Sequence, residues 1–537
     1  MYGTATYFFN HLIRATAIVL VMGLFTTTQA TAQVTAFKQS VAEAAARDDD
    51  LSEFYRTNNY EGIWTGTDRQ DQARRQALLQ AIGQAKAHGL PEARYEAEKL
   101  IALMKAAKTP RDLGRVEVEM SRTFLLLARD MQTGVLVPSE VDNEIKRERL
   151  YRNRVSYLTD LTESTPKVFF RELSPKAAEY GRLMKEKIRL EALLAKGGWG
   201  AKVPAKSLKP GASGPAVVAL RNRLIKMGFL SRSSSKTYDD KLAKAVQSFQ
   251  GAHGLVVNGE AGARTINAIN ITVESRIKSI IVAMERERWM NFDRGDRHVL
   301  VNLPDFSTRI IDYGKVTFQT RSVVGKNAYD RRSPEFSDEM EHMVINPTWH
   351  VPRSIAVKEY LPQMQRNSRA VSYLKMYNSR GQEVSRSNIN FRAYNASNFP
   401  YFMKQPPSNT NALGLVKFML PNKYNIYLHD SPAKKLFEAN VRAFSHGCIR
   451  LQRPFEFAYA ILAKQESNPK EFFQSNLNSG ERRQVNLETK IPVHIIYRTA
   501  FTQAKGPVQY RDDVYGRDAK IWKALNNAGV SLNAVQS

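Results

Sequence analysis

Apolar residues recur at every third or fourth position through the first part of the chain. Between about Gln33 and Lys196, Ala, Leu, Glu, Lys and Arg dominate, and the apolar positions are spaced as on one face of successive helices. One helical run ends at Gly89, with Pro91 two residues later, and this combination stops a helix. The pattern predicts a helical domain over residues 33–200. No cluster of titratable side chains in it indicates chemistry.

A stretch rich in Gly and Pro, from Gly197 to Gly211, follows this helical domain and marks a linker. Apolar residues then return at an ordered spacing, which predicts a compact module over residues 205–272. The positions that carry this prediction are Val217, Leu220, Leu224, Leu242, Val246 and Phe249.

Beyond Arg297 the apolar period changes from that of helices to that of strands. The segments that read as strands are His298–Leu303, Thr308–Asp312, Lys315–Val324, Met343–Asn346 and Val493–Tyr497. They predict a β-rich domain with antiparallel hairpins over residues 296–525. Residues 353–411 interrupt the pattern, with a helical stretch near Ala356–Met364. Because this region is too long for a plain loop, we expect a helical insert, or lid, over a site. The fold class expected for the whole chain is therefore multidomain α+β.

The N-terminal residues have the order of an export signal. A single basic residue, Arg14, precedes a mostly apolar run from Ala15 to Phe25, and small residues follow at Ala30 and Ala32. The apolar run is shorter than the ~20 residues that a bilayer-spanning helix needs. We expect residues 1–32 to be a cleaved signal peptide. An uncleaved membrane anchor is the alternative.

Composition adds a class of partner. The 537 residues include 79 Lys and Arg against 52 Asp and Glu, which gives a formal net charge of +27. Such a charge attracts polyanions in general. Because an exported protein meets little nucleic acid, the charge favours cell wall or membrane over nucleic acid. The hydrophobic fraction of 43% is enough to fill real cores, and the length suggests about three domains.

A solitary cysteine makes the candidate chemistry specific. Cys448 is the only cysteine, which excludes an intramolecular disulfide and a Cys-rich zinc module. It ends the run Ser445-His446-Gly447-Cys448, nineteen residues after His429. An imidazole within reach of a thiol can take its proton, and Gly447 allows a tight turn beside the nucleophile, so that amides there face an oxyanion. The alternative is a small buried hydrophobe. An unpaired thiol outside the cytosol is an oxidation liability, however, and that favours a chemical role.

These residues resemble the catalytic domain of the L,D-transpeptidases, the YkuD domain, whose signature is His, a spacer of about fifteen residues, and Ser/Thr-His-Gly-Cys. His429 and residues 445–448 match it. Arg450 stands where the family often has Asn, which marks the large Gram-negative branch with a helical scaffold, a wall-binding module and a lid. The resemblance extends from about Ser40 to Asp518.

The compact module has a resemblance of its own. Residues 211–265 are similar to the peptidoglycan-binding domain type 1, a small three-helix module. Arg221 and Asn258 depart from its pattern, at positions where Gln and Asp are usual. The alternative is a helical spacer with no ligand.

The resemblance implies roles for individual residues. Cys448 is the implied nucleophile, which forms a thioester, and His429 is the implied acid and base. A main-chain or side-chain acceptor around Asp430 would fix the His429 tautomer. His446, Gly447 and Cys448 would supply the oxyanion environment, whereas Ser445 would hold the loop.

Three further residues are candidate substrate contacts. Arg450 would clamp a substrate carboxylate or hold the loop, Trp349 would shape the cleft, and Lys417 lies in a segment that matches the family. Simpler interpretations remain open: Asp430 as a turn residue, His446 as a structural histidine, Arg450 as a surface or lid-contacting charge, and Trp349 as core.

The function that the resemblance implies is a periplasmic L,D-transpeptidase that forms 3→3 cross-links in peptidoglycan, with no metal and no cofactor. Its partners would be peptidoglycan stem peptides. The same chemistry with outer-membrane proteins as acceptors is one alternative, and a catalytically idle wall-binding scaffold is another. No nucleic acid is expected as a partner, and a membrane only if the N-terminal segment is uncleaved.

Overall fold

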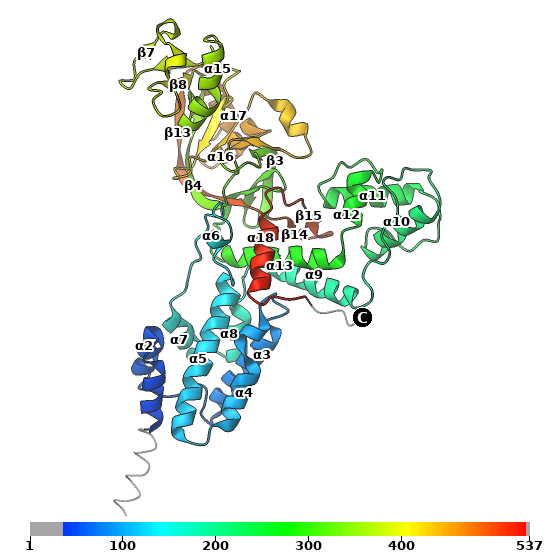
Figure 1. The fold of residues 1–537 in the computed structure, drawn as a ribbon, viewed down its shortest axis with the longest axis vertical. Helices are drawn as coiled ribbons and strands as arrows, with labels where there is room; N and C mark the ends of the chain where they lie inside the picture. Colours follow the sequence, from blue (N-terminus) through cyan, green and yellow to red (C-terminus); the bar gives the residue numbers. More distant parts are fainter. Residues whose placement is uncertain (1–35, 533–537) are drawn as a thin grey trace, which may run out of the picture.

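The computed structural model describes residues 36–532, and the expected export signal, residues 1–32, lies outside them. The multidomain α+β class is confirmed (Figure 1): a helical N-terminal bundle lies at one end, a β-rich domain at the other, and a small helical module projects sideways from the helices between them. Within the described part of the chain, no helix is both long and apolar enough to cross a membrane.

The N-terminal bundle is built from amphipathic helices around one apolar core. Its longest helix, α5 (Pro110–Thr133), starts with a capping box between Thr109 and Asp112 and with Pro at its first position. Trp64 and Phe124 are in contact at the centre of the core. The other elements are a helix over 36–45, α2 (Asp49–Thr57), α3 (Arg69–Gln84), η1 (Glu92–Tyr95), α4 (Ala97–Ala106), α6 (Pro138–Val141), α7 (Arg154–Glu163) and α8 (Pro166–Glu172).

Helix α9 (Ala178–Leu194) leaves the bundle and packs on α13 (Val273–Trp289), the helix that leads into the β-rich domain. The C-terminal helix α18 (Arg517–Asn527) shares their apolar cluster. These three helices form a hub that connects all the domains (Figure 1). Sequence periodicity placed α9 with the bundle, because a spacing of apolar residues does not reveal which partner they face.

The sideways module contains α10 (Pro215–Lys226), α11 (Asp240–Ala252) and α12 (Ala263–Ile269), and the six apolar residues that predicted it are buried in its core. Arg221, one of the two departures from the usual pattern, is buried and pairs with Asp239 at 2.9 Å. The module is fixed to the C-terminal segment, because Arg264 pairs with Asp512 at 2.9 Å and Arg511 donates to the Ala252 carbonyl at 3.0 Å.

The β-rich domain is built on a nine-stranded sheet with the order β11-β3-β12-β10-β9-β4-β13-β1-β2. The long strand β3 also pairs with β2, so that the order returns on itself. Helices α16 (Pro454–Leu462) and α17 (Pro469–Asn478) belong to the same domain. The strands are β1 (Arg297–Asn302), β2 (Ser307–Asp312), β3 (Lys315–Gly325), β4 (Phe336–Ile345), β9 (Val416–Met419), β10 (Leu428–His429), β11 (Ala443–Ser445), β12 (Ile449–Leu451) and β13 (Arg483–Ile496).

The expected antiparallel hairpins describe only part of this sheet. Strands β1, β2 and β3 are joined as antiparallel neighbours. However, β1 pairs with β13, β10 with β12, and β3 with β11 in parallel. Parallel pairs need long connections, and a short strand segment in the sequence carries no mark of the distant strand that it joins.

The insert over residues 353–411 is a small subdomain with its own core rather than a purely helical segment. The expected helical stretch is present as α14 (Arg353–Ile355), the π-helical turn η2 (Ala356–Tyr360) and α15 (Leu361–Arg366). It adjoins a four-stranded sheet of β5 (Trp349–His350), β8 (Phe402–Gln405), β6 (Lys375–Tyr377) and β7 (Glu383–Val384). Short turns η3 (Arg386–Asn388) and η4 (Phe391–Ala393) complete it, while η5 (Lys434–Glu438) and the β14–β15 ribbon (Ala500–Phe501, Gln509–Tyr510) lie outside the insert.

Candidate functional site

The pairing of β10 with β12 places the two main candidates at one site. The strands are parallel neighbours in which Leu428 lies opposite Ile449 and His429 opposite Arg450. Cys448 directly precedes β12, two residues before the partner of His429, so its side chain lies on the same face of this strand pair as the His429 ring. Both line a cavity of about 740 Å³. Six of the nine predicted site residues line this cavity: Trp349, His429, Ser445, His446, Cys448 and Arg450.

His429 is held as a neutral base. Its Nδ1 lies 2.5 Å from the main-chain carbonyl of Asp430. Because a carbonyl only accepts, Nδ1 carries the proton and Nε2 keeps its lone pair. The ring is 4% exposed. Burial, and then the charge of Arg450, lower the pKa of His429 to about 3, so the imidazole is uncharged at neutral pH.

Asp430 acts on His429 through its main chain, while its carboxylate organises the turn. One carboxylate oxygen accepts from the Leu415 amide at 3.0 Å, and the other accepts from Ser431 N and Lys434 Nζ, each at 2.6 Å. Gly414 makes room for this arrangement: its φ is +61°, and a Cβ there would lie 2.3 Å from a carboxylate oxygen of Asp430.

Cys448 is half-buried, and its thiol is a weak acid. Its Sγ donates to the carbonyl of Asn425 at 3.5 Å. Burial raises the pKa of Cys448 to about 11, although a hydrogen bond from Tyr427 and the charges of Arg450 and Lys417 act in the opposite direction. The thiol and the imidazole that line this cavity are therefore both neutral at neutral pH, so a reaction through the thiolate would require the thiol to lose its proton during that reaction.

The loop before Cys448 is held by Ser445. Its hydroxyl donates to the Cys448 carbonyl at 2.6 Å and accepts from the Gly447 amide at 3.1 Å. Gly447 has φ +118°, a region that favours glycine, and a Cβ there would lie 3.1 Å from Ile426. Of the loop residues, His446 is the one that turns to solvent, toward the insert.

The insert contacts this loop through charged side chains. Glu359 lies 2.7 Å from the His446 Nε2 and also 2.7 Å from Arg331. Lys358 pairs with Asp330 at 2.8 Å. All five of these residues line the cavity. The insert is thus positioned as a lid, and His446 contacts the lid rather than His429.

The three predicted substrate contacts have different surroundings. Arg450 lines the cavity, and within the described residues its buried Nε has no hydrogen-bond partner. Trp349 lines the cavity too, but it is mostly buried in the core of the lid. Lys417 lies opposite His429 on β9, and burial lowers its pKa. It is not among the cavity-lining residues, so it acts on the site through its charge, which favours the thiolate of Cys448.

Sequence reasoning missed Glu359, Tyr427 and Ser333. Tyr427 hydrogen-bonds to Cys448, and burial raises the pKa of its hydroxyl. Ser333 donates to the carbonyl of Gly447 at 2.6 Å. Nothing in a single sequence assigns a target to the Ser333 hydroxyl. Among residues 36–532, no cluster of His, Cys, Asp and Glu has the arrangement of a metal site.

The three-helix module meets the C-terminal segment through a stack of rings. His253 lies 3.7 Å from Phe249 and 5.4 Å from Tyr510, measured between ring centroids. The Arg276 guanidinium lies over the Tyr510 ring, 4.1 Å from its centroid. This stack joins the module, α13 and the C-terminal segment, so the module is docked through an extensive contact.

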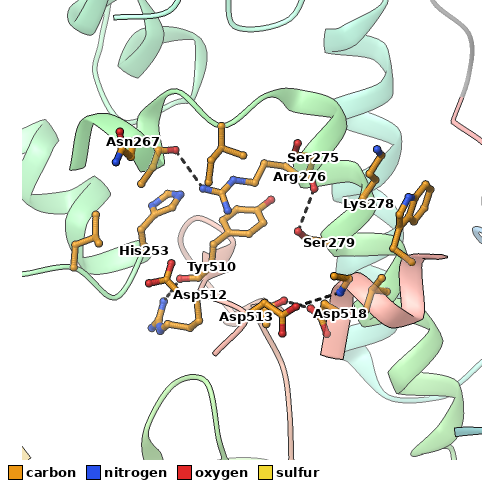
Figure 2. Close-up of a pocket in the computed structure, with 18 of the residues that line it drawn as sticks. His253, Asn267, Ser275, Arg276, Lys278, Ser279, Tyr510, Asp512, Asp513 and Asp518 are labelled. Atoms are coloured by element: carbon orange, nitrogen blue, oxygen red, sulfur yellow. Dashed lines mark hydrogen bonds between the residues drawn. The ribbon is translucent and has the colours of Figure 1, made fainter. Parts of the chain in front are cut away.

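A second cavity of about 640 Å³ adjoins this stack (Figure 2). The module contributes His253 and Asn267 to its wall, α13 contributes Lys278, and the C-terminal segment contributes Asp512 and Trp522. Ligand sites often lie at domain interfaces and combine aromatic surface with a few polar groups, as this cavity does.

Family models match three separate parts of the chain. Residues 296–478 match the L,D-transpeptidase catalytic domain called YkuD, residues 213–269 match a "Putative peptidoglycan binding domain", and residues 49–186 match a "Scaffold domain".

A curated protein of Haemophilus influenzae, named "Putative L,D-transpeptidase", is 26% identical over 297 residues. That alignment covers 54% of this chain and 58% of the relative, so the chain spans less than two thirds of the relative's length.

Two solved structures are similar over parts of the chain. An L,D-transpeptidase from Xylanimonas cellulosilytica is 14% identical, with 54% of this chain and 98% of that one covered and a TM-score of 0.17. The avibactam carbamoyl form of the enzyme Ldtfm is 13% identical, with 58% and 98% covered and a TM-score of 0.19. Because both scores are below 0.5, the assignment depends on the family models. The chain thus contains a YkuD-type L,D-transpeptidase catalytic domain at residues 296–478, and this domain carries the cavity lined by His429 and Cys448.

Proposed function

We propose that this chain is an exported, periplasmic L,D-transpeptidase that forms 3→3 cross-links in peptidoglycan through a thioester on Cys448. The observation that supports this most strongly is one cavity, partly covered by a lid, in which Cys448, His429 and Arg450 come together. Removal of residues 1–32 would take away Arg14 and leave a net charge of +26, which attracts a wall polymer that carries free carboxylates.

In the acylation step, Sγ of Cys448 attacks the carbonyl carbon of the third residue of a tetrapeptide stem. The thiol proton passes to Nε2 of His429, which is free because Nδ1 is bonded to Asp430. Loop amides beside Cys448 stabilise the oxyanion. The C–N bond to the terminal D-Ala then breaks, and its amine leaves with the proton from His429.

In the transfer step, a side-chain amine of a second stem attacks the thioester. It gives its proton to His429, the C–S bond breaks, and the proton returns to the sulfur, so that the thiol is regenerated. Water would give hydrolysis instead. The lid contacts made by Lys358 and Glu359 favour transfer, because they restrict the access of water to the thioester.

The proposal is tested with the purified chain and a disaccharide-tetrapeptide. We expect an adduct in the intact mass spectrum that peptide mapping places on Cys448, and dimeric products whose bond joins two third residues. A carbapenem serves as a second acylating probe. If neither compound gives an adduct with the wild-type protein, the chain is not a transpeptidase, and the idle-scaffold interpretation replaces this one.

Wall analysis distinguishes the two enzymatic alternatives. Cells that express the chain should gain 3→3 dimers if stem amines are the acceptors. Wall-bound protein fragments without new dimers would instead show that outer-membrane proteins are the acceptors.

We propose that the three-helix module holds peptidoglycan at the second cavity. We expect Trp522→Ala and Asn267→Ala to weaken co-sedimentation with purified peptidoglycan about five- to tenfold, the effect of losing one good contact in a binding site. Lys236→Ala is the matched control, because Lys236 is exposed on the same module and lines neither cavity. Acylation by a carbapenem should not change in any of the three. Equal binding by all variants would exclude this cavity as the wall site.

A further inference from the structure

The carbonyl just before the nucleophile is held by a residue from another part of the domain. The Ser333 hydroxyl donates to the Gly447 carbonyl at 2.6 Å and accepts from the Gly325 amide at 2.9 Å. Ser333 is 0% exposed. In a trans peptide the carbonyl and the next amide point in opposite directions. The hydroxyl that holds the Gly447 carbonyl therefore also sets the direction of the Cys448 amide.

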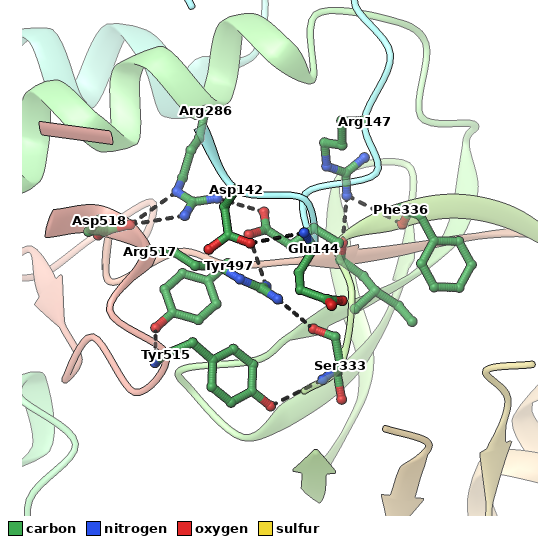
Figure 3. Close-up of polar contacts among 12 residues, drawn as sticks. Asp142, Glu144, Arg147, Arg286, Ser333, Phe336, Tyr497, Tyr515, Arg517 and Asp518 are labelled. Carbon is green, nitrogen blue, oxygen red and sulfur yellow. Dashed lines mark hydrogen bonds and ion pairs between the residues drawn. The ribbon is translucent and has the colours of Figure 1, made fainter. Parts of the chain in front are cut away.

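Ser333 is in turn held by the C-terminal helix (Figure 3). Arg517 is the first residue of α18 and is 0% exposed. Its Nη2 donates to the Ser333 carbonyl at 2.9 Å, and its Nη1 pairs with Glu335 at 3.1 Å. The Tyr515 hydroxyl, two residues earlier, donates to the Gly325 carbonyl at 2.6 Å. Two contacts from this segment thus fix the backbone on either side of the Ser333 hydroxyl.

The same short segment receives contacts from the rest of the molecule. The second carboxylate oxygen of Glu335 pairs with Arg286 of α13 at 2.6 Å, and Arg286 also pairs with Asp518 at 3.0 Å. The main chain of Glu335 bonds on both sides to the strand-like connection that leaves the N-terminal bundle, with distances of 2.9 Å to Glu144 and 2.8 Å to Lys146. Residues 333–335 are therefore the point where the bundle, the hub and the C-terminal helix meet.

Stability alone is a weak explanation for this cluster. A buried ion pair often contributes little net stability, because the cost of removing two charges from water offsets their attraction. What a fully buried, charged and hydrogen-bonded side chain provides is a fixed position. Two hydrogen bonds connect Arg517 to the residue just before Cys448: one from Arg517 to Ser333, and one from Ser333 to Gly447.

We propose that Ser333 and Arg517 are positioning residues for acyl transfer, which aim the Cys448 amide at the oxyanion. The C-terminal helix, which lies beyond residues 296–478, then takes part in catalysis through the loop that it holds. This inference rests on the proposed acylation of Cys448. Neither residue is among those that line the cavity, so each acts only through the Gly447–Cys448 peptide.

Two reactions of the same sulfur separate positioning from general structural damage. Acylation by a carbapenem passes through an oxyanion, whereas alkylation by iodoacetamide displaces iodide and does not. We expect Ser333→Ala to lower the limiting acylation rate about 10- to 100-fold, somewhat less than the loss of an oxyanion donor itself. The carbapenem concentration for half-maximal rate and the alkylation rate should stay within about twofold, since binding and thiol chemistry are not affected.

Further variants complete the experiment on the full-length chain. Ser333→Thr keeps the hydroxyl and should restore most of the acylation rate, while Arg517→Gln should lower it about tenfold. Lys520→Ala is the matched control. Lys520 lies on the same helix as Arg517, and its ion pair with Asp142 does not reach the loop. Two results would overturn the inference: acylation of Ser333→Ala and Arg517→Gln at the wild-type rate, or a decrease in the alkylation rate equal to that in the acylation rate. If the wild-type chain is alkylated but never acylated, the proposed function itself fails.

Discussion

Replacing Cys448 with Ser is expected to abolish acylation by both the tetrapeptide and a carbapenem. The serine hydroxyl ionises far less readily than a thiol, and a neutral imidazole with a pKa of about 3 is too weak a base to compensate. We expect the acylation rate to fall by at least about four orders of magnitude, as for the loss of other enzymatic nucleophiles. Stopped-flow acylation and intact mass spectrometry measure the loss directly.

The fold should tolerate this change. The sulfur is half-buried and its hydrogen bond to Asn425 is weak, at 3.5 Å, so a hydroxyl fits in its place. The midpoint of thermal unfolding should therefore move by only about 1–2 °C, an effect of a fraction of a kcal/mol. Because the chain has a single cysteine, thiol titration of the variant should also read zero. Residual acylation at the wild-type rate would show that another residue is the nucleophile.

Replacing His429 with Gln is expected to lower the acylation rate by about 10²- to 10⁴-fold, the usual contribution of a positioned general base. A glutamine side chain is close to histidine in size, and its amide can still donate to the Asp430 carbonyl. It cannot accept the proton of the Cys448 thiol. Lys434→Ala is a matched control, since it removes a cation that pairs with the Asp430 carboxylate at 2.6 Å without touching the ring. An unchanged rate in His429→Gln would exclude His429 as the base.

The pH dependence of the two proteins should differ in a characteristic way. The pKa of His429 is lowered to about 3 and that of Cys448 is raised to about 11. Between about pH 5 and 9 the wild-type pair therefore stays neutral, and acylation should be nearly independent of pH. In His429→Gln only the spontaneously formed thiolate reacts, so the rate should rise about tenfold per pH unit. A wild-type profile with an acid limb near the ordinary histidine pKa of about 6.5 would contradict this assignment.

The sequence predicted those features that are encoded within a few neighbouring residues. The α+β class is confirmed. The short run that ends at Cys448 predicted an L,D-transpeptidase catalytic domain, and the match of residues 296–478 confirms that domain. Apolar spacing located the helices of the module and most strands of the main sheet, because burial of one face imposes a period on the chain. The hydrogen bond from His429 was expected around Asp430, without a choice between its carbonyl and its carboxylate.

Features that depend on distant partners were not predictable. The parallel pairing of β10 with β12, which brings His429 to the cavity of Cys448, leaves no local pattern. Glu359 looks like any other helix carboxylate until the fold places it 2.7 Å from His446. Arg517 has no local pattern that sets it apart from an exposed arginine, yet it is among the most deeply buried side chains of the described residues. Each is a polar residue whose role depends on a partner tens or hundreds of positions away.

The position of β13 in the sheet limits when this protein can become active. This strand lies between β4 and β1 and pairs with both, yet it is one of the last elements of the chain. Until residue 496 has been synthesised, β4 and β1 expose open edges that readily join other strands. The helices of the N-terminal bundle fold from local contacts, so they are complete while Cys448 still lies in an unfinished sheet. A nascent or truncated chain thus carries the folded N-terminal bundle without the finished cavity of Cys448. Such a chain avoids aggregation only if the open edges of β4 and β1 do not pair with strands of other molecules.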